Sequence, residues 1–154
     1  MYRTHRRRSE ALRPAWGRLI KEVDPSQPEP VVVRGPLDAV TILRERAGRE
    51  LVEVFYVIAL NSQSRVIGIQ EVTRGILNSS LVHPREVFRL AIAFGAAGII
   101  VAHNHPSGDP TPSADDRAIT RQLVDAGRLL DIPVYDHLVL GAQRYLSFAE
   151  AGLL

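Results

Sequence analysis

The stretch AGIIVAHNHPSGDPTPSADDRAITRQLVDAGRLL, residues 97–130, carries the clearest fold signal in the chain. Its first part, residues 97–103, is a short and almost wholly apolar run that predicts a buried strand. A loop rich in proline and glycine follows at 104–112, and residues 113–130 place apolar side chains at helical spacing. A strand that leads through a loop into an amphipathic helix is typical of α/β proteins.

The segments on either side of this stretch extend the same alternation. A β-branched and aromatic run and the segment after it predict two strands of a hairpin, and proline and glycine mark the ends of two further helices. The predicted helices are 35–48 and 83–95, and the predicted strands are 52–61, 65–75, 132–141 and a short last one near the C-terminus. The sequence therefore predicts an α/β fold, a three-layer α-β-α sandwich around one sheet.

Composition narrows the classes of protein that this chain can belong to. The chain has 154 residues, with 45% apolar and 23% charged residues, which suits one globular domain. Its longest apolar run, 54–60, has the length of a strand and is far too short to span a membrane. The basic N-terminus has no apolar segment behind it and so does not look like a secretory signal. We expect a cytoplasmic protein with no membrane partner.

The chain has no cysteine. Disulfides, zinc ribbons and zinc deaminases with cysteine ligands are thereby excluded, because each needs sulfur. Any metal site must use nitrogen and oxygen ligands.

The N-terminal segment differs in charge from the rest of the chain. Residues 1–21 contain seven basic residues and one acidic residue, and the proline-rich stretch DPSQPEP follows at 24–30. We expect residues 1–30 to be a basic, partly disordered arm and linker, with one helical turn around Trp16, Leu19 and Ile20, and residues 31–154 to be the domain. The arm is either a solvated tail or a weak electrostatic contact for nucleic acid.

Three side chains of the opening stretch form a candidate metal site. His103 ends the predicted strand, and His105 lies two residues further on, so in an extended chain both side chains point to the same side. Asp116 falls in the first turn of the next helix, where the helix dipole favours a negative charge. Two imidazoles and one carboxylate leave a fourth tetrahedral position open, as in catalytic zinc sites.

The same residues also have a purely structural interpretation. Ser113 and Asp116 have the spacing of a capping box, and the residues around His103 fit a polar turn after a strand. Each of these patterns alone favours the structural interpretation. The joint spacing H-x-H-P-x6-S-x2-D is much harder to obtain by chance, and it favours the metal site.

This spacing resembles the JAMM motif of MPN-type metallopeptidases, and its surroundings resemble the RadC family of bacterial proteins. The similarity covers about residues 31–154 and rests on HNHPSGDPTPS (103–113), VHPREVFRLAI (82–92), DHLVLG (136–141) and YLSFAEAGLL (145–154). It implies a JAMM-like fold with a mixed sheet, related in layout to the cytidine deaminases. Members of the RadC family usually carry a helical N-terminal domain, and residues 1–30 are too few to form one.

The resemblance also implies roles for individual residues. His103, His105 and Asp116 would bind Zn²⁺, and Ser113 would help to stabilise the transition state. The general acid/base of the family is a glutamate that begins an apolar strand, and Glu53 matches that position. Glu71 and Glu86 are rivals for this role.

The implied function is zinc-dependent hydrolysis of a peptide or isopeptide bond. Two alternatives remain open: a nucleic-acid-binding protein associated with DNA repair, and an inactive metal-binding interaction module. The letters HNH do not indicate an HNH nuclease, because in those enzymes the named residues are dispersed. His137 is either a neutral core histidine or a support for a metal ligand, with Asp136 as its possible carboxylate partner.

Overall fold

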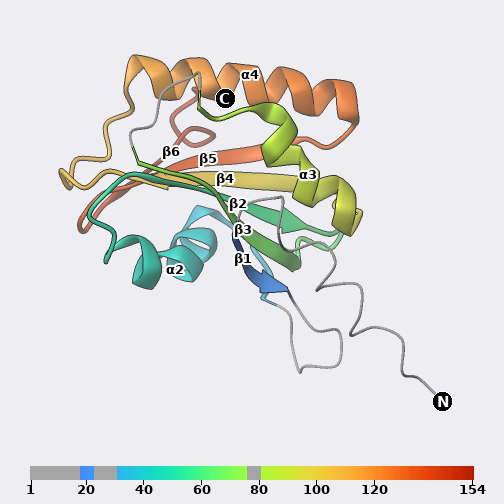
Figure 1. Cartoon of the computed structure of the whole chain (residues 1–154), viewed down its shortest axis with the longest axis horizontal. Helices are drawn as coiled ribbons and strands as arrows, with labels where there is room; N and C mark the ends of the chain where they lie inside the picture. Colours follow the sequence, from blue (N-terminus) through green and yellow to red (C-terminus); the bar gives the residue numbers. More distant parts are fainter. Residues whose placement is uncertain (1–17, 23–30, 76–80) are drawn as a thin grey trace.

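The computed structural model describes residues 31–75 and 81–154, and the main chain of residues 18–22 (Figure 1). Within these residues, six strands form one sheet in the order β1-β3-β2-β4-β5-β6. Their bounds are Arg18–Glu22 (β1), Val54–Leu60 (β2), Val66–Arg74 (β3), Gly98–Asn104 (β4), Val134–Leu140 (β5) and Tyr145–Ser147 (β6). β4 and β5 run parallel, and the other neighbouring strands run antiparallel. The mixed sheet and the hairpin of β2 and β3 are thus confirmed.

Helices cover both faces of the sheet. α2 (Pro36–Ala47) lies on one face, while α3 (Pro84–Phe94) and α4 (Ala114–Leu130) lie on the other (Figure 1). α2 and α3 each begin with a proline, whose fixed φ suits the first helical turn, and α3 ends at Gly95 in the left-handed conformation. The three-layer α-β-α sandwich predicted from the sequence is confirmed.

The core divides into two clusters because alternate residues of each strand point to opposite faces. On the face of α3 and α4, Phe55, Val57 and Val101 pack with the apolar sides of those helices. On the face of α2, Tyr56 and Ile100 pack with that helix. Every residue of β2 and β4 is buried, which explains why both strands are continuous apolar runs in the sequence.

Two expectations about local structure are wrong. Leu19 and Ile20 lie in β1, which pairs with β3, and do not form a helical turn. Leu129, which the helical spacing places on the inner side of α4, is 89% exposed. Residues 1–17, with Trp16, and residues 23–30 lie outside the described residues, so the expected arm and the domain boundary stay predictions. In the described part of the chain, no helix is long and apolar enough to cross a membrane.

Candidate metal centre

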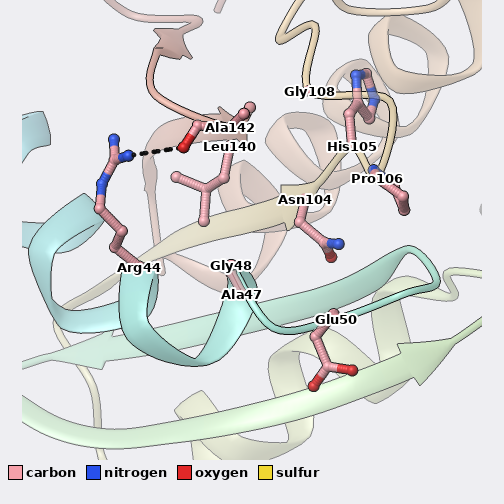
Figure 2. Close-up of a pocket in the computed structure, with 11 residues that line it drawn as sticks. Arg44, Ala47, Gly48, Glu50, Asn104, His105, Pro106, Gly108, Leu140 and Ala142 are labelled. Atoms are coloured by element: carbon pink, nitrogen blue, oxygen red, sulfur yellow. Dashed lines mark hydrogen bonds between the residues drawn. The ribbon is translucent and has the colours of Figure 1, made fainter.

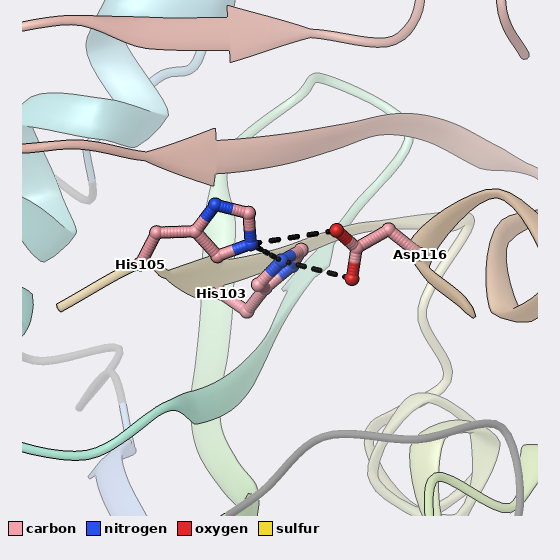
Figure 3. A group of neighbouring side chains, drawn as sticks. All are labelled: His103, His105 and Asp116. Carbon is pink, nitrogen blue, oxygen red and sulfur yellow. Dashed lines mark hydrogen bonds and ion pairs between the residues drawn. The ribbon is translucent and has the colours of Figure 1, made fainter. Parts of the chain in front are cut away.

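The candidate metal ligands come from the end of β4 and the start of α4 (Figure 3). His103 is the sixth residue of β4, and its ring lies on the same face of the sheet as Val101, toward α4. His105 follows the end of the strand, and Asp116 is the third residue of α4. The loop between strand and helix turns back on itself at Gly108, whose φ of +86° is one that glycine adopts without strain. The fold therefore brings all three side chains together.

The spacing of the three groups fits a small divalent cation. The Nε2 atoms of His103 and His105 lie 3.0 Å apart. Nε2 of His103 lies 3.1 Å from Oδ1 of Asp116, and Nε2 of His105 lies 3.4 Å from Oδ2 of Asp116. Ligand atoms of a tetrahedral Zn²⁺ at about 2.0–2.1 Å from the ion lie about 3.3 Å from one another. The described residues hold this one group of His, Cys, Asp and Glu side chains that could bind a metal.

A buried chain of hydrogen bonds fixes which nitrogen of His103 faces the site. The Thr120 hydroxyl donates to the main-chain oxygen of Asp116 (2.6 Å) and lies 2.6 Å from Nδ1 of His137. Because the hydroxyl proton is donated to Asp116, the Thr120 oxygen must accept a hydrogen bond from Nδ1 of His137. The neutral His137 ring then has its lone pair on Nε2, which accepts from Nδ1 of His103 at 2.9 Å. The lone pair of His103 is then on Nε2 and points toward Asp116.

His105 presents the same nitrogen for a similar reason. Its Nδ1 donates to the main-chain oxygen of Asp109 at 2.7 Å, so its Nε2 carries the lone pair in the neutral ring. Two lone pairs and a carboxylate that converge at these distances repel one another unless a cation lies between them. The donor set therefore fits a metal ion, with a proton as the competitor.

The pKa shifts of these groups agree with that geometry. Burial alone raises the pKa of Asp116, but the hydrogen bonds that the imidazoles donate when their Nε2 atoms are protonated outweigh it and hold that pKa well below its usual range. The hydrogen bond to Asp116 raises the pKa of His105 above 6.5, and the charge of Glu53 acts in the same direction. Burial lowers the pKa of His137 well below 6.5, so its ring is neutral at pH 7.

Ser113 caps α4, as its spacing to Asp116 predicts. Its Oγ accepts from the main-chain N–H of Asp116 (3.0 Å), and Asp116 Oδ2 accepts from the Ser113 N–H (2.7 Å). The Ser113 residue is exposed, and the hydroxyl proton is not used by the cap. The capping box and the metal site are thus compatible, because the cap holds the Asp116 carboxylate in the orientation that faces the histidines.

Glu53 lies directly before β2, whose second residue is next to His103. Phe55 pairs with His103 across β2 and β4, and its ring stacks on the His103 imidazole. Continued by two residues beyond the pair Phe55 and His103, the alternation of side chains and the antiparallel register would direct Glu53 to the face of Phe55 and bring it next to His105. The pKa of His105 is raised mainly by its hydrogen bond to Asp116, and the charge of Glu53 adds a small effect in the same direction.

The rival glutamates are engaged elsewhere. Both oxygens of Glu71 accept from Arg74, each at 2.8 Å. Glu86 lies in the first turn of α3, next to Arg85 and Arg89.

The sequence predicts His137 to be either a core residue or a support for a metal ligand, and in the structure it is both buried and in contact with His103. It is fully buried, and it contacts the His103 ring through Nε2. The expected pairing of its ring with Asp136 is wrong: Asp136 accepts from the main-chain N–H of His137, and the ring contacts His103 and Thr120. The sequence analysis missed Thr120, although it lies four residues after Asp116, on the same face of the helix.

A cavity of about 130 Å³ adjoins this end of the sheet on the side of α2 (Figure 2). Asn104 and His105 lie on its wall, together with Arg44, which donates to the main-chain oxygen of Ala142 at 3.4 Å. Figure 2 shows the Asn104 side chain between the turn at Pro106 and the segment that leads from α2 to β2. The end of β4 is thus open to solvent-sized molecules on the α2 side.

Comparison with known proteins identifies the family of this chain. The model of the RadC-like JAB domain matches residues 33–153. The chain belongs to the RadC family. The match covers all of the candidate metal ligands together with Glu53 and Ser113, and so includes the whole site described above.

Individual RadC relatives are similar over most of this chain. A UPF0758 protein of Symbiobacterium thermophilum is 55% identical over 112 residues, which are 73% of this chain and 48% of the relative. A UPF0758 protein of Moorella thermoacetica is 50% identical over 80% of this chain and 54% of the relative. One of Listeria monocytogenes is 45% identical over 88% of this chain and 60% of the relative. The chain thus spans about half the length of these curated relatives. Their names assign no activity.

Proposed function

We propose that this RadC-family chain is a zinc-dependent hydrolase of the JAMM type, which cleaves a peptide or isopeptide bond with water. The observation that carries the proposal is the convergence of two Nε2 atoms and the Asp116 carboxylate within 3.0–3.4 Å of one another. Zn²⁺ held there would polarise the scissile carbonyl and acidify water.

The residues around the ion would divide the remaining work. Glu53 would take a proton from the attacking water and transfer it to the leaving amine, so that the C–N bond breaks to give a carboxylic acid and an amine. Ser113, whose hydroxyl proton is not used in the helix cap, would donate a hydrogen bond to the oxygen that becomes negative in the transition state. Its position at the start of α4, three residues before Asp116, supports this role.

The test separates metal binding from hydrolysis. Zinc-loaded wild-type protein and Glu53→Gln are incubated with a library of peptides and isopeptides, and new amino groups are measured. We expect both proteins to bind one zinc and the variant to lose about 10²–10⁴-fold in rate, the usual contribution of a general base. Equal rates would refute the role of Glu53. A wild-type protein that binds zinc and cleaves nothing would be the inactive metal-binding module.

A further inference from the structure

We propose that Asn104, the residue between the two histidines, is a positioning residue that aligns Glu53 with His105. This inference rests on the proposed function, because it assigns Asn104 a part in the action of Glu53. It concerns a side chain that contacts neither of the metal-ligand nitrogens. Its contacts are all with the main chain that leads into β2.

β4 pairs with β2 on one side and with β5 on the other, and the two ladders end at different residues. The ladder between β4 and β2 ends at the pair His103 and Phe55. Two residues later, the N–H of His105 donates to the main-chain oxygen of Leu140, on the β5 side, at 2.8 Å. The main chain just before β2 would therefore have no hydrogen-bond partner in the β4 main chain. This is the segment that carries Glu53, the proposed general base.

The side chain of Asn104 takes the place of the missing main chain. Its Oδ1 accepts from the N–H of Val54 at 2.8 Å, and its Nδ2 donates to the main-chain oxygen of Val52 at 2.9 Å. The residue is 3% exposed, so these bonds are largely shielded from water. One amide group thus continues the ladder for one further step.

These two bonds bracket Glu53. They hold the residue before it and the residue after it, while the main-chain oxygen of Glu53 accepts from the N–H of Gly75 at 2.8 Å. Glu53 is thereby fixed from β4 on one side and from the end of β3 on the other. Because the main chain is held on both sides, the Glu53 side chain starts from a fixed position opposite His105.

Asparagine suits this position because its amide offers a donor and an acceptor in one plane, like a peptide group. Aspartate has no donor for Val52, and leucine has neither group. Main-chain flexibility at Glu53 would misplace its carboxylate, and a misplacement of about 1 Å costs on the order of 100-fold in rate.

The experiment compares Asn104→Ala with Asn61→Ala in the zinc-loaded chain. Asn61 also binds two main-chain N–H groups, those of Gln63 and Arg65, but it lies at the opposite end of β2. Three quantities are measured: hydrogen exchange of the Val54 amide by NMR, zinc affinity, and kcat and KM for a peptide that the wild type cleaves.

For Asn104→Ala we expect rapid exchange at Val54, a kcat lower by about 10- to 100-fold, and zinc affinity and KM close to wild type. Asn61→Ala should leave Val54 protected and kcat unchanged. A purely structural role of Asn104 would lower stability without changing kcat in the folded protein.

The outcomes separate this inference from the proposed function. If the wild type cleaves no peptide, the proposed function fails, and the role of Asn104 in catalysis fails with it. If the wild type is active and Asn104→Ala keeps its kcat, or Val54 stays protected, only the inference about Asn104 is overturned. A parallel loss of zinc affinity would also overturn it, because Asn104 would then act on the ligands.

Discussion

Two aspartates of this RadC domain, Asp116 and Asp136, are both buried but differ in the groups that contact their carboxylates. Asp136 accepts from three donors: the main-chain N–H groups of His137 and Ala149 and the hydroxyl of Ser147. Asp116 accepts from one main-chain N–H, that of Ser113, and otherwise faces two imidazole nitrogens.

The difference lies in the protons that the neighbours supply. Every group around Asp136 brings its own proton, so the carboxylate is satisfied and needs no ion. The nitrogens that face Asp116 bring lone pairs in their neutral state, so this carboxylate needs a cation to complete it. A buried carboxylate therefore indicates a metal site only when its neighbours are acceptors.

The largest effect that this comparison predicts is on zinc binding. Asp116→Asn removes a ligand, and we expect its zinc affinity to fall by more than about 100-fold, beyond the loss usual for residues that only support a ligand. Asp136→Asn should bind zinc as the wild type does. Competition with a chromogenic chelator measures both, and equal losses would contradict the distinction between the two carboxylates.

The next effect concerns the hydrogen-bond chain behind His103. His137→Ala removes the partner of the His103 Nδ1 atom, so the ring is free to rotate or to change its tautomer. We expect a zinc affinity lower by about 10- to 100-fold, measured by the same competition. His83→Ala, at the start of α3, is the control and should bind zinc normally.

The third effect is on stability. Asp136→Ala leaves two main-chain N–H groups without an acceptor, and we expect the free energy of unfolding to fall by about 2–3 kcal/mol. Urea denaturation of the metal-free protein measures it. A loss below about 0.5 kcal/mol, typical of a surface position, would show that these hydrogen bonds do not stabilise the fold.

A further prediction concerns pH. Because Asp116 raises the pKa of His105, the ring in the metal-free protein binds a proton at higher pH than free imidazole does. Zinc must displace that proton, so its affinity should be constant above the raised pKa and fall by about tenfold per pH unit below it. Titrations of zinc at several pH values test this. An affinity that is constant down to pH 5 would contradict it.

The same pKa shifts have opposite effects on the metal-free fold. The raised pKa of His105 contributes stability that is present below pH 6.5 and lost as the pH rises through the folded-state pKa. The lowered pKa of Asp116 contributes stability that is present above its usual pKa and lost at lower pH. Zinc should flatten the first dependence, because it replaces the proton on His105.

The smallest effect is expected for the N-terminal arm. Deleting residues 1–17 removes five arginines and leaves β1, Arg18–Glu22, in the sheet. If the arm contacts nucleic acid, the deletion should weaken binding to duplex DNA and reduce its salt dependence, as measured by fluorescence anisotropy at several salt concentrations. Unchanged binding would leave no role for the arm in DNA contact.

The sequence was sufficient for the sandwich and for the convergence of His103, His105 and Asp116, because both depend on local patterns. The apolar run of β4, the proline-rich loop and the capping box of α4 each leave a signal within a few residues. The pairing of β1 with β3 left no such signal, because it joins segments about 50 residues apart whose register only the folded sheet fixes.

The residues that were missed act through other residues. Thr120 and Asn104 are small polar side chains whose partners, His137 and the main chain before β2, come from other elements. Their hydrogen bonds to these other elements depend on packing, and no spacing in the sequence encodes those contacts. The supports of a site are therefore harder to predict than its ligands.

The central claim is that one metal ion binds between β4 and the start of α4, and a crystal structure of the zinc-soaked protein tests it most directly. We predict an anomalous zinc peak at about 2.0–2.2 Å from Nε2 of His103, Nε2 of His105 and a carboxylate oxygen of Asp116, with solvent at the fourth position. No peak at saturating zinc, or a peak bound by other residues, would contradict the account.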